Sequence, residues 1–396
     1  MKANQSIKIN ILSPGRFHVC DLARELDKNG FDVKFYSFVP ARRAEKFGLP
    51  RRCSKSGIGI MAPFLVIERK IFKHAQWPQR LRIAVQDYIT AIYMRPCDIC
   101  IAMSGSFLYA PQRAQRQGAV VILERGSKHI LEQKRILDEL KKMSPTTSTV
   151  PDINVRRELE GYKIADYISI ASKHVKRSFL LHNYPEEKLF LNPYGVDVSM
   201  FHQITEAVKK YDVIMVGGWS YRKGCDLIVE AVRQLEISLL HVGGIVDLPF
   251  PNESNFTHVN SVDEKLLPKY YAQAKVFVLP SREEGLALVQ AQAAACNLPI
   301  VCSKDSGGED IKHLLGDTEY IEVMEDTTTE CLKQHITSLL KKQKILCNES
   351  YAQDYLPKLS WLRYGTTYAQ FLRGIDTMGG VKYGKRYAHF LNTITL

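Results

Sequence analysis

Two segments in the second half of the chain combine glycine with charged side chains in a way that suits a phosphorylated ligand. The first, 216–224 (VGGWSYRKG), follows an apolar run that predicts a strand and opens a predicted helix. Glycine lets backbone approach a ligand closely, and a helix N-terminus offers free N–H groups and positive partial charge. Arg222 and Lys223 would add full charges. The segment predicts a diphosphate cradle, although an ordinary glycine-rich turn with a solvated Arg-Lys pair has the same pattern.

The second segment, 280–299 (PSREEGLALVQAQAAACNLP), has the pattern of a strand end, an acidic-glycine loop and a helix of small residues. Glu284 stands just before Gly285 at the predicted carboxyl end of the strand, where open α/β sheets bind their ligands. An acidic residue beside a helix N-terminus is also favourable without any ligand. A polar Gly-Gly loop, 303–309 (SKDSGGE), follows the next predicted strand and would face the same crevice.

Strands and helices alternate from one end of the chain to the other, which predicts α/β layers with mostly parallel sheets. The spacing predicts a first β-α-β unit from a strand over 7–12, a helix over 21–28 and a strand over 31–38. The second half repeats the pattern with a strand over 212–216 and a helix over 222–235. With 396 residues the chain is long enough for two domains. We expect domains over 1–190 and 191–358 and a helical segment over 359–396.

Together the segments resemble the donor domain of glycosyltransferase family 4. The chain supplies the matching residues in order and at matching spacing: Gly217, Lys223-Gly224, Pro280-Ser281, Glu284-Gly285, Ala293, Pro299 and Gly307-Gly308. The segment 192–197 with Phe201 resembles the interdomain joint of that family, and Ser360-Trp361 resembles its closing segment, which returns to the first domain. The resemblance implies the GT-B fold, with two Rossmann-like, doubly wound domains facing each other across a cleft. It also implies transfer of a sugar from a nucleotide-diphosphate sugar with retention of anomeric configuration, here in bacterial surface polysaccharide synthesis such as that of lipopolysaccharide.

The resemblance also implies roles for single residues. Lys223 would bind the donor diphosphate, Glu284 would hydrogen-bond the transferred sugar, and His129 would lie near the reacting carbon; these are the predicted catalytic residues. The predicted donor-binding residues are Gly217, Gly218, Arg222, Lys223, Glu284, Gly285, Leu286, Ala287, Leu288 and Gln292. The residues predicted on the acceptor side of the cleft, after strands of the first half, are Gly15, Arg16, His18 and Arg125.

Two positions depart from the family pattern. Gln292 stands where the family has a second glutamate that reaches the ribose; an amide still donates and accepts hydrogen bonds but carries no charge. Gly218 stands where an arginine often binds phosphate, and Arg222 could replace it. The departures keep an alternative open, in which a degenerate GT-B protein serves as a non-catalytic partner or scaffold. A nucleotide-sugar epimerase of the same fold is a further alternative.

Metal chemistry is not expected for the transfer. The chain contains no D-x-D triplet, the acidic pair with which GT-A transferases hold a divalent ion. Cationic side chains and helix N-termini would offset the leaving charge instead, so we predict no metal and no cofactor beyond the nucleotide-sugar co-substrate. Cys97 and Cys100 form a C-x-x-C pair without a second pair to complete a zinc site. The nine scattered cysteines suit a reducing compartment.

Positive charge is concentrated in the first half. Residues 1–200 carry 33 Lys and Arg against 19 Asp and Glu, a net +14, and the remainder has a net charge of −2. Many of the cations alternate with apolar residues between Arg42 and Arg82. This pattern favours an anionic partner, and our hypothesis is peripheral docking of a cytoplasmic protein on the inner face of the plasma membrane, where a lipid-linked glycan would be the acceptor. The alternative is a solvated basic surface over a soluble acceptor.

Two further classes are not expected. The chain shows no helix-turn-helix, zinc or RNA-binding signature, so nucleic acid is not an expected partner. No leader peptide is expected, and the longest apolar run falls far short of the roughly 20 residues that cross a bilayer.

Overall fold

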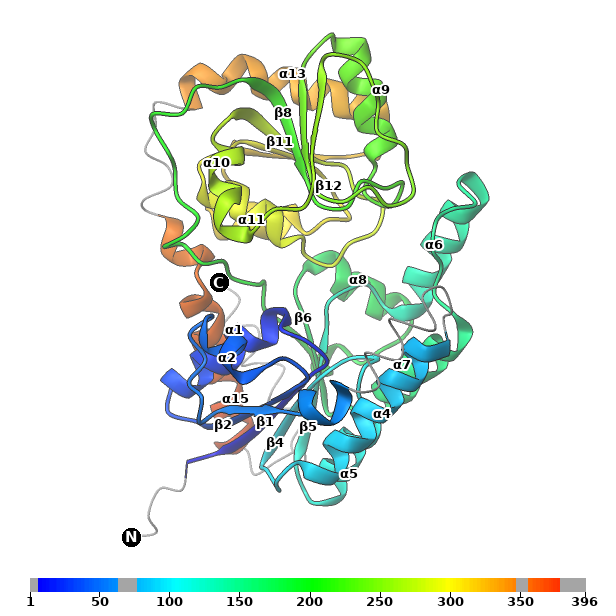
Figure 1. Ribbon diagram of the computed structural model, residues 1–396, viewed down its shortest axis with the longest axis vertical. Helices are drawn as coiled ribbons and strands as arrows, with labels where there is room; N and C mark the ends of the chain where they lie inside the picture. The colour runs from blue at the N-terminus through cyan, green and yellow to red at the C-terminus, as the bar shows by residue number, and fades with distance from the viewer. Residues whose placement is uncertain (1–5, 63–76, 347–354, 378–396) are drawn as a thin grey trace.

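The computed structural model describes residues 6–62, 77–346 and 355–377. Two α/β domains are stacked along the long axis of the molecule, the first below the second in Figure 1. Each has a fully parallel sheet, of seven strands in the first domain and six in the second. No described helix is both long and apolar enough to cross a membrane.

The first sheet has the strand order β3-β2-β1-β4-β5-β6-β7. Its strands are β1 (Lys8–Ser13), β2 (Asp32–Ser37), β3 (Ser54–Ser56), β4 (Ile99–Met103), β5 (Val120–Arg125), β6 (Tyr167–Ile170) and β7 (Leu189–Leu191). The helices are α1 (Phe17–Lys28), α2 (Ala41–Glu45), α4 (Trp77–Tyr93), α5 (Tyr109–Arg116), α6 (Ile130–Met143), α7 (Asp152–Ile164) and α8 (Lys173–Leu181), followed by the short η1 (Glu186–Lys188). Because the order reverses beside β1, the sheet is doubly wound, with crevices at the carboxyl ends of its strands.

The second sheet has the order β10-β9-β8-β11-β12-β13. Its strands are β8 (Tyr211–Val216), β9 (Leu239–Val242), β10 (Phe256–Val259), β11 (Ala274–Leu279), β12 (Ile300–Ser303) and β13 (Ile321–Met324). The helical elements are α9 (Cys225–Leu235), η2 (Glu264–Leu266), α10 (Leu267–Tyr271), α11 (Leu288–Ala295), α12 (Gly308–Leu314) and α13 (Thr329–Leu346). Strands β9 and β12 are buried along their whole length, as expected for parallel strands covered on both faces.

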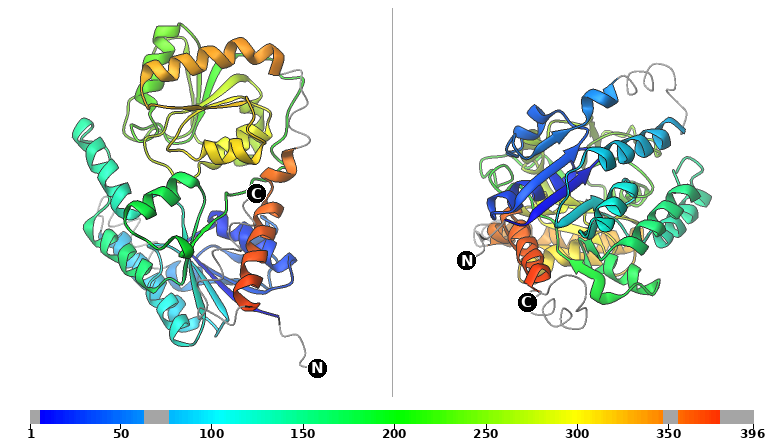
Figure 2. Two further views of the ribbon diagram at one scale, coloured as in Figure 1. Left: turned by 180° about the vertical axis from the view of Figure 1, so that it is seen from behind. Right: turned by 90° about the horizontal axis from the view of Figure 1, so that it is seen from below.

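The last described segment crosses back to the first domain. It consists of η3 (Leu356–Leu359) and α15 (Trp361–Thr377), and α15 lies beside α1 in both views of Figure 2. Phe371 stacks on Phe190 with 3.9 Å between ring centroids. A Cβ added to Gly365 would lie 2.2 Å from the Cβ of Glu25, so α15 packs closely on α1 only with glycine there.

Two predicted helix starts were wrong. Helix α9 begins at Cys225, not at 222, because Gly224 has a positive φ of 71° and Ser220–Lys223 form a turn. Helix α1 begins at Phe17, four residues before the predicted start. The first correction matters for function, since it places Arg222 and Lys223 in a loop rather than on a helix.

Candidate functional site

Two loops of the second domain are locked together at the carboxyl edge of its sheet. The guanidinium of Arg282, after β11, donates to both carboxylate oxygens of Asp226 on α9, at 2.6 and 2.7 Å. The backbone N–H of Arg282 donates to the carbonyl of Arg222 at 2.9 Å. A Cβ on Gly224 would lie 2.2 Å from the carbonyl oxygen of Pro280, so only glycine allows this approach. These three contacts, which we call the loop clamp, fix the 220–224 loop against the 280–285 loop.

The loop clamp brings Lys223 and Glu284 into contact. The Lys223 ammonium forms an ion pair with the Glu284 carboxylate, and the Arg222 guanidinium lies 3.4 Å from the same oxygen. Burial and the neighbouring Arg222 charge lower the pKa of Lys223 to about 7, while the charge of Glu283 opposes the shift. The result is a half-buried cluster of two cations around one carboxylate, which we call the Lys223–Glu284 cluster.

The first domain covers this cluster with backbone and small polar groups. Ser172, after β6, donates its hydroxyl to the carbonyl of Gly285 at 3.0 Å, and His174 Nε2 donates to the carbonyl of Glu284 at 2.9 Å. Burial, together with the charge of Lys128, lowers the pKa of His174 to about 4, which leaves its ring neutral at neutral pH. A Cβ on Gly285 would lie 2.0 Å from the carbonyl oxygen of Gly126.

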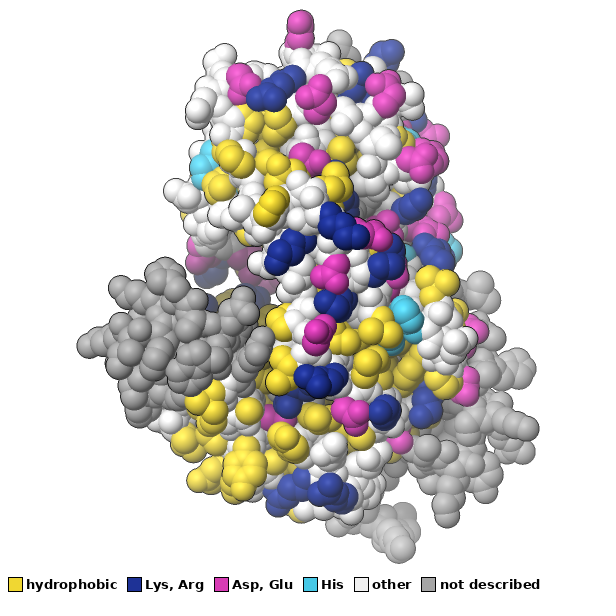
Figure 3. Space-filling view, turned by 90° about the vertical axis from the view of Figure 1, so that its right-hand side faces the viewer, with side chains coloured by type: hydrophobic (Ala, Val, Ile, Leu, Met, Phe, Trp, Pro, Cys, Tyr) yellow, Lys and Arg dark blue, Asp and Glu magenta, His cyan; other side chains and the backbone are white. Residues whose placement is uncertain are grey.

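Further polar and ionic contacts join the two domains beside the Lys223–Glu284 cluster. Ser127 donates to the buried carboxylate of Glu283, and Lys128 pairs with Asp305 at 2.8 Å. Acidic and basic side chains gather along the boundary between the domains on the face seen in Figure 3. The loops after β5 and β6 therefore meet the loops after β11 and β12, so the carboxyl edges of the two sheets face each other.

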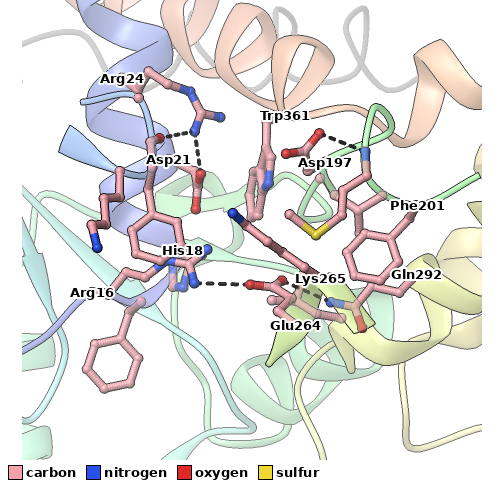
Figure 4. A pocket seen from close by; sticks show the side chains of 18 residues that line it. Arg16, His18, Asp21, Arg24, Asp197, Phe201, Glu264, Lys265, Gln292 and Trp361 are labelled. Atoms are coloured by element: carbon pink, nitrogen blue, oxygen red, sulfur yellow. Dashed lines mark hydrogen bonds and ion pairs between the residues drawn. The ribbon is translucent and has the colours of Figure 1, made fainter. Parts of the chain in front are cut away.

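A cavity of about 490 Å³ opens between the domains beside α11 (Figure 4). The side chains of Arg16, Glu264 and Gln292 meet there. The carboxylate of Glu264 accepts from Arg16 Nη1 at 3.1 Å and from Gln292 Nε2 at 3.3 Å. The amide oxygen of Gln292 accepts from the Tyr271 hydroxyl at 3.1 Å. A carboxylate from the η2 turn thus stands next to the position where the family pattern has its second glutamate.

The predicted donor-binding residues fall into two neighbouring groups at the carboxyl edge of the second sheet, one at the Lys223–Glu284 cluster and one at the cavity. Gly217 has a positive φ of 129°, and its carbonyl oxygen would lie 2.0 Å from a Cβ on Gly243. Leu286 and Ala287 are buried, and Leu288 is the first residue of α11 and lines the cavity. The Ala287 N–H already donates to the carbonyl of Ser306 at 3.2 Å. The structure therefore brings Arg222, Lys223 and Glu284 together, with Leu288 and Gln292 lining the neighbouring cavity.

His129 is buried among residues of the first domain. It caps α6, its ring is stacked on His182 at 4.3 Å, and it also contacts Tyr162 and Phe179 of the same domain. Burial and the nearby His182 and Arg125 lower the pKa of His129 to about 3. The described contacts of the ring are thus internal to the first domain, and its catalytic role stays a prediction.

The predicted acceptor-side residues are divided between the cavity and the first domain's interior. Arg16 and His18 line the cavity, and His18 also bonds the buried Glu124 carboxylate at 2.9 Å. That carboxylate accepts from the Tyr368 hydroxyl of α15 at 2.7 Å. Gly15 belongs to the turn just before Arg16.

Arg125 points inward. It donates to the carbonyl of Lys128 at 2.7 Å and pairs with Glu158 at 2.7 Å, so it supports the 126–128 loop from below. Its acceptor-side role stays a prediction.

Sequence reasoning missed Glu264 and His174. Glu264 belongs to a charged D-E-K triplet before a helix with a proline near its start. In the sequence this pattern is typical of a solvent-exposed turn, and only the fold brings Arg16 and Gln292 next to it. His174 follows a predicted strand, and that position could have indicated it.

Comparison with known proteins agrees with this picture. Residues 210–342 match the sequence model of the family described as "Glycosyl transferases group 1". A GDP-mannose-dependent alpha-(1-6)-phosphatidylinositol monomannoside mannosyltransferase of Mycolicibacterium smegmatis is 26% identical over 244 residues, which are 53% of this chain and 63% of that protein. The chain spans between 41% and 63% of the length of the curated relatives it matches.

Solved structures share the fold across nearly the whole chain. Sucrose-phosphate synthase of Thermosynechococcus elongatus superposes with a TM-score of 0.66 at 14% identity, covering 94% of this chain and 100% of that one. HepE of Anabaena, solved with UDP and glucose, gives a TM-score of 0.63 at 13% identity, covering 93% and 99%. The predicted fold, two Rossmann-like α/β domains in the GT-B arrangement, is confirmed.

Proposed function

We propose that this chain, whose second domain matches the group 1 glycosyl transferases, moves a sugar from a nucleotide-diphosphate donor to a glycan or lipid-linked glycan. The observation that carries the proposal is the Lys223–Glu284 cluster, which stands at the carboxyl edge of the matching domain and faces the other domain. The relative named as GDP-mannose-dependent and the neighbour solved with UDP support a nucleotide-sugar donor.

In the proposed reaction the donor diphosphate replaces Glu284 as the counterion of Lys223 and Arg222. The released carboxylate then accepts hydrogen bonds from hydroxyls of the transferred sugar. The bond from the anomeric carbon to the diphosphate oxygen breaks, and the acceptor oxygen bonds to that carbon on the same face. The acceptor proton goes to the departing phosphate, so no protein base is needed and configuration is retained. Two cations and the N-terminus of α11 stabilise the charge that develops on the leaving group, so we propose a metal-independent transfer.

Glu264 supplies the carboxylate that position 292 lacks. A ribose has two neighbouring hydroxyls, which a carboxylate can accept together. The Glu264 carboxylate lies in the cavity beside Gln292, between donors from both domains. A donor ribose bound there would replace the Arg16 or Gln292 contact. Such a contact would compensate for one of the two departures from the family pattern, the glutamine at position 292.

Thermal stabilisation by donor tests the function. The wild type and Glu284→Ala would be melted with UDP-, GDP-, ADP- and TDP-sugars, because a ligand of the native state must raise Tm by mass action. We expect a shift with one nucleotide, reduced in Glu284→Ala. The control is Glu253→Ala, which removes a surface partner of Arg233. A folded protein that responds to none of the donors would favour the scaffold alternative.

For the acceptor we propose a lipid-linked glycan of surface polysaccharide synthesis at the cytoplasmic face of the membrane. The support is the exposed basic surface of the first domain and the lipid acceptor in the relative's name. Between Arg42 and Arg82, the cations that the structure describes as exposed are Arg42, Arg43, Lys46, Arg51, Arg52 and Lys55. Arg69, Lys70 and Lys73 lie outside the described residues, and the side chain of Arg80 is not described.

Flotation with vesicles tests the docking. At low salt we expect binding to vesicles that contain anionic lipid and loss of binding to neutral ones. Equal recovery with both vesicle types would contradict the proposal.

A further inference from the structure

A mixed group of side chains lies at the free edge of the second sheet. Glu325 directly follows β13, and Cys331 and His335 stand one turn apart on α13. Their ligand atoms all lie within 4.8 Å of one another. The Glu325 Oε2 atom is 3.4 Å from Cys331 Sγ and 3.1 Å from His335 Nε2. These three side chains, called here the edge triad, are not used by the proposed transfer.

Two of the three separations match those expected around a tetrahedral ion. With Zn–O and Zn–N distances of about 2.0 Å and a Zn–S distance of about 2.3 Å, tetrahedral angles place O and N about 3.3 Å apart and O and S about 3.5 Å apart. The observed values of 3.1 and 3.4 Å are each within a few tenths of an ångström. Hydrogen bonds from Cys331 and from His335 to Glu325 give the same two distances without a metal, so the assignment depends on how the His335 ring is oriented.

His335 is held from behind by a carboxylate. Its Nδ1 atom lies 2.8 Å from Glu322 Oε2, on β13. The other oxygen of Glu322 accepts from Ser338 at 2.7 Å and lies 3.4 Å from Lys342 Nζ. A carboxylate on one ring nitrogen fixes the proton there and directs the lone pair of the other nitrogen to a metal. Here that other nitrogen, Nε2, is the one that faces Glu325.

The side chains of this group differ in how far they are exposed to solvent. The side chains of Glu322 and His335 are 14% and 20% exposed, whereas Glu325 is 77% exposed. The positioning carboxylate is therefore inside and the entry side is open to water. Lys304, in the loop after β12, donates to the carbonyl of Glu325 at 3.0 Å, which joins the triad to the loop that carries Asp305.

We propose that the edge triad binds Zn²⁺ or a similar divalent transition metal, with water in the fourth position. A thiolate and an imidazole together disfavour Mg²⁺ and Ca²⁺, which prefer oxygen. Binding releases the Cys331 thiol proton, so affinity rises with pH. The ion would tie the chain after β13 to α13. It is separate from the Lys223–Glu284 cluster, and the transfer is still proposed to be metal-independent.

Cobalt substitution tests the site in the full chain. Reduced, chelator-treated protein titrated with Co²⁺ should give a thiolate-to-cobalt charge-transfer band at one ion per chain. Cys331→Ser should remove that band. The matched control is Cys97→Ser, because Cys97 is a similarly half-buried thiol elsewhere. No band in the wild type, or a band that survives Cys331→Ser but not Cys97→Ser, would overturn the proposal.

A second measurement separates ligand from positioning residue. Zn²⁺ should raise the Tm of the wild type and of Cys97→Ser but not of His335→Ala. Glu322→Gln should keep the charge-transfer band and weaken metal affinity by about 10-fold, as expected for a residue that acts through the imidazole. Melting without metal shows whether each variant folds. Equal Zn²⁺ stabilisation of His335→Ala and wild type would contradict the assignment.

Discussion

The two domains place different kinds of chemical groups at the Lys223–Glu284 cluster. The second domain presents charged side chains, Lys223 and Glu284, from loops that the Arg282–Asp226 pair fixes to each other. Around this cluster the first domain contributes the backbone of Gly126 and the hydroxyl of Ser172, and its Arg125 points inward to Glu158. Its charged contacts across the cleft, such as Lys128 with Asp305, lie beside the cluster. From this difference we predict that the residues that act on the donor lie in the second domain and that the first domain limits how closely the two domains approach.

Removing the Glu284 carboxylate from the second domain should have the largest effect on catalytic efficiency. We expect Glu284→Ala to lower kcat/KM by about 10²- to 10³-fold, the usual cost of one polar group that acts on the transition state. Initial rates with the donor found by thermal shift measure this. Glu253→Ala should stay near wild type. Comparable rates in Glu284→Ala and wild type would move the chemistry to other residues.

A steric change at the contact between the two sides should come next. In Gly285→Ala the new Cβ would need the space now within 2.0 Å of the Gly126 carbonyl, so the domains could not approach as they do. We expect turnover to fall by about 10-fold or more, since small misplacements are costly in catalysis. The control is Gly59→Ala, where a Cβ meets nothing within 4 Å. If both variants turn over alike, closure does not depend on this contact.

The pH dependence of donor binding sharpens the role of Lys223. Burial and the Arg222 charge lower the pKa of Lys223 to about 7, and a diphosphate binds the protonated amine. The donor KM should therefore rise as pH increases above about 7, approaching tenfold per pH unit at most. Lys223→Arg keeps its charge throughout and should flatten that rise. Parallel pH profiles for both proteins would place the titration elsewhere.

The smallest effect on donor binding should come from removing Glu264, the proposed contact to the donor ribose. Glu264→Ala should raise the donor KM by about 5- to 10-fold, which corresponds to the net contribution of one ordinary hydrogen bond. Gln292→Glu in the same background should restore binding, because it returns a carboxylate to the neighbouring position. A structural role for Glu264 would not be rescued in this way. Donor titrations of the three proteins decide between the two.

Much of the second domain could be predicted from sequence because its signals are local. Glycines at 217, 224 and 285 mark places where backbone must turn or approach closely, and charged residues stand beside them. The position of α9 was predicted three residues early, since Arg222 and Lys223 suit a helix by propensity while the left-handed Gly224 prevents it. The edge triad was missed because its ligands come from a strand end and from one helix face.

The amino-acid order by itself determined the parallel α/β architecture and the pairing of a cationic loop with an acidic-glycine loop, because strand periodicity and glycine backbone freedom act over a few residues. Only the tertiary structure decided that Glu264 lies beside Gln292, that Arg125 and His129 turn inward, and that Glu322 backs His335. These contacts join residues that are far apart in the chain or on different elements. Packing, charge pairing and burial select them only once the sheets have formed.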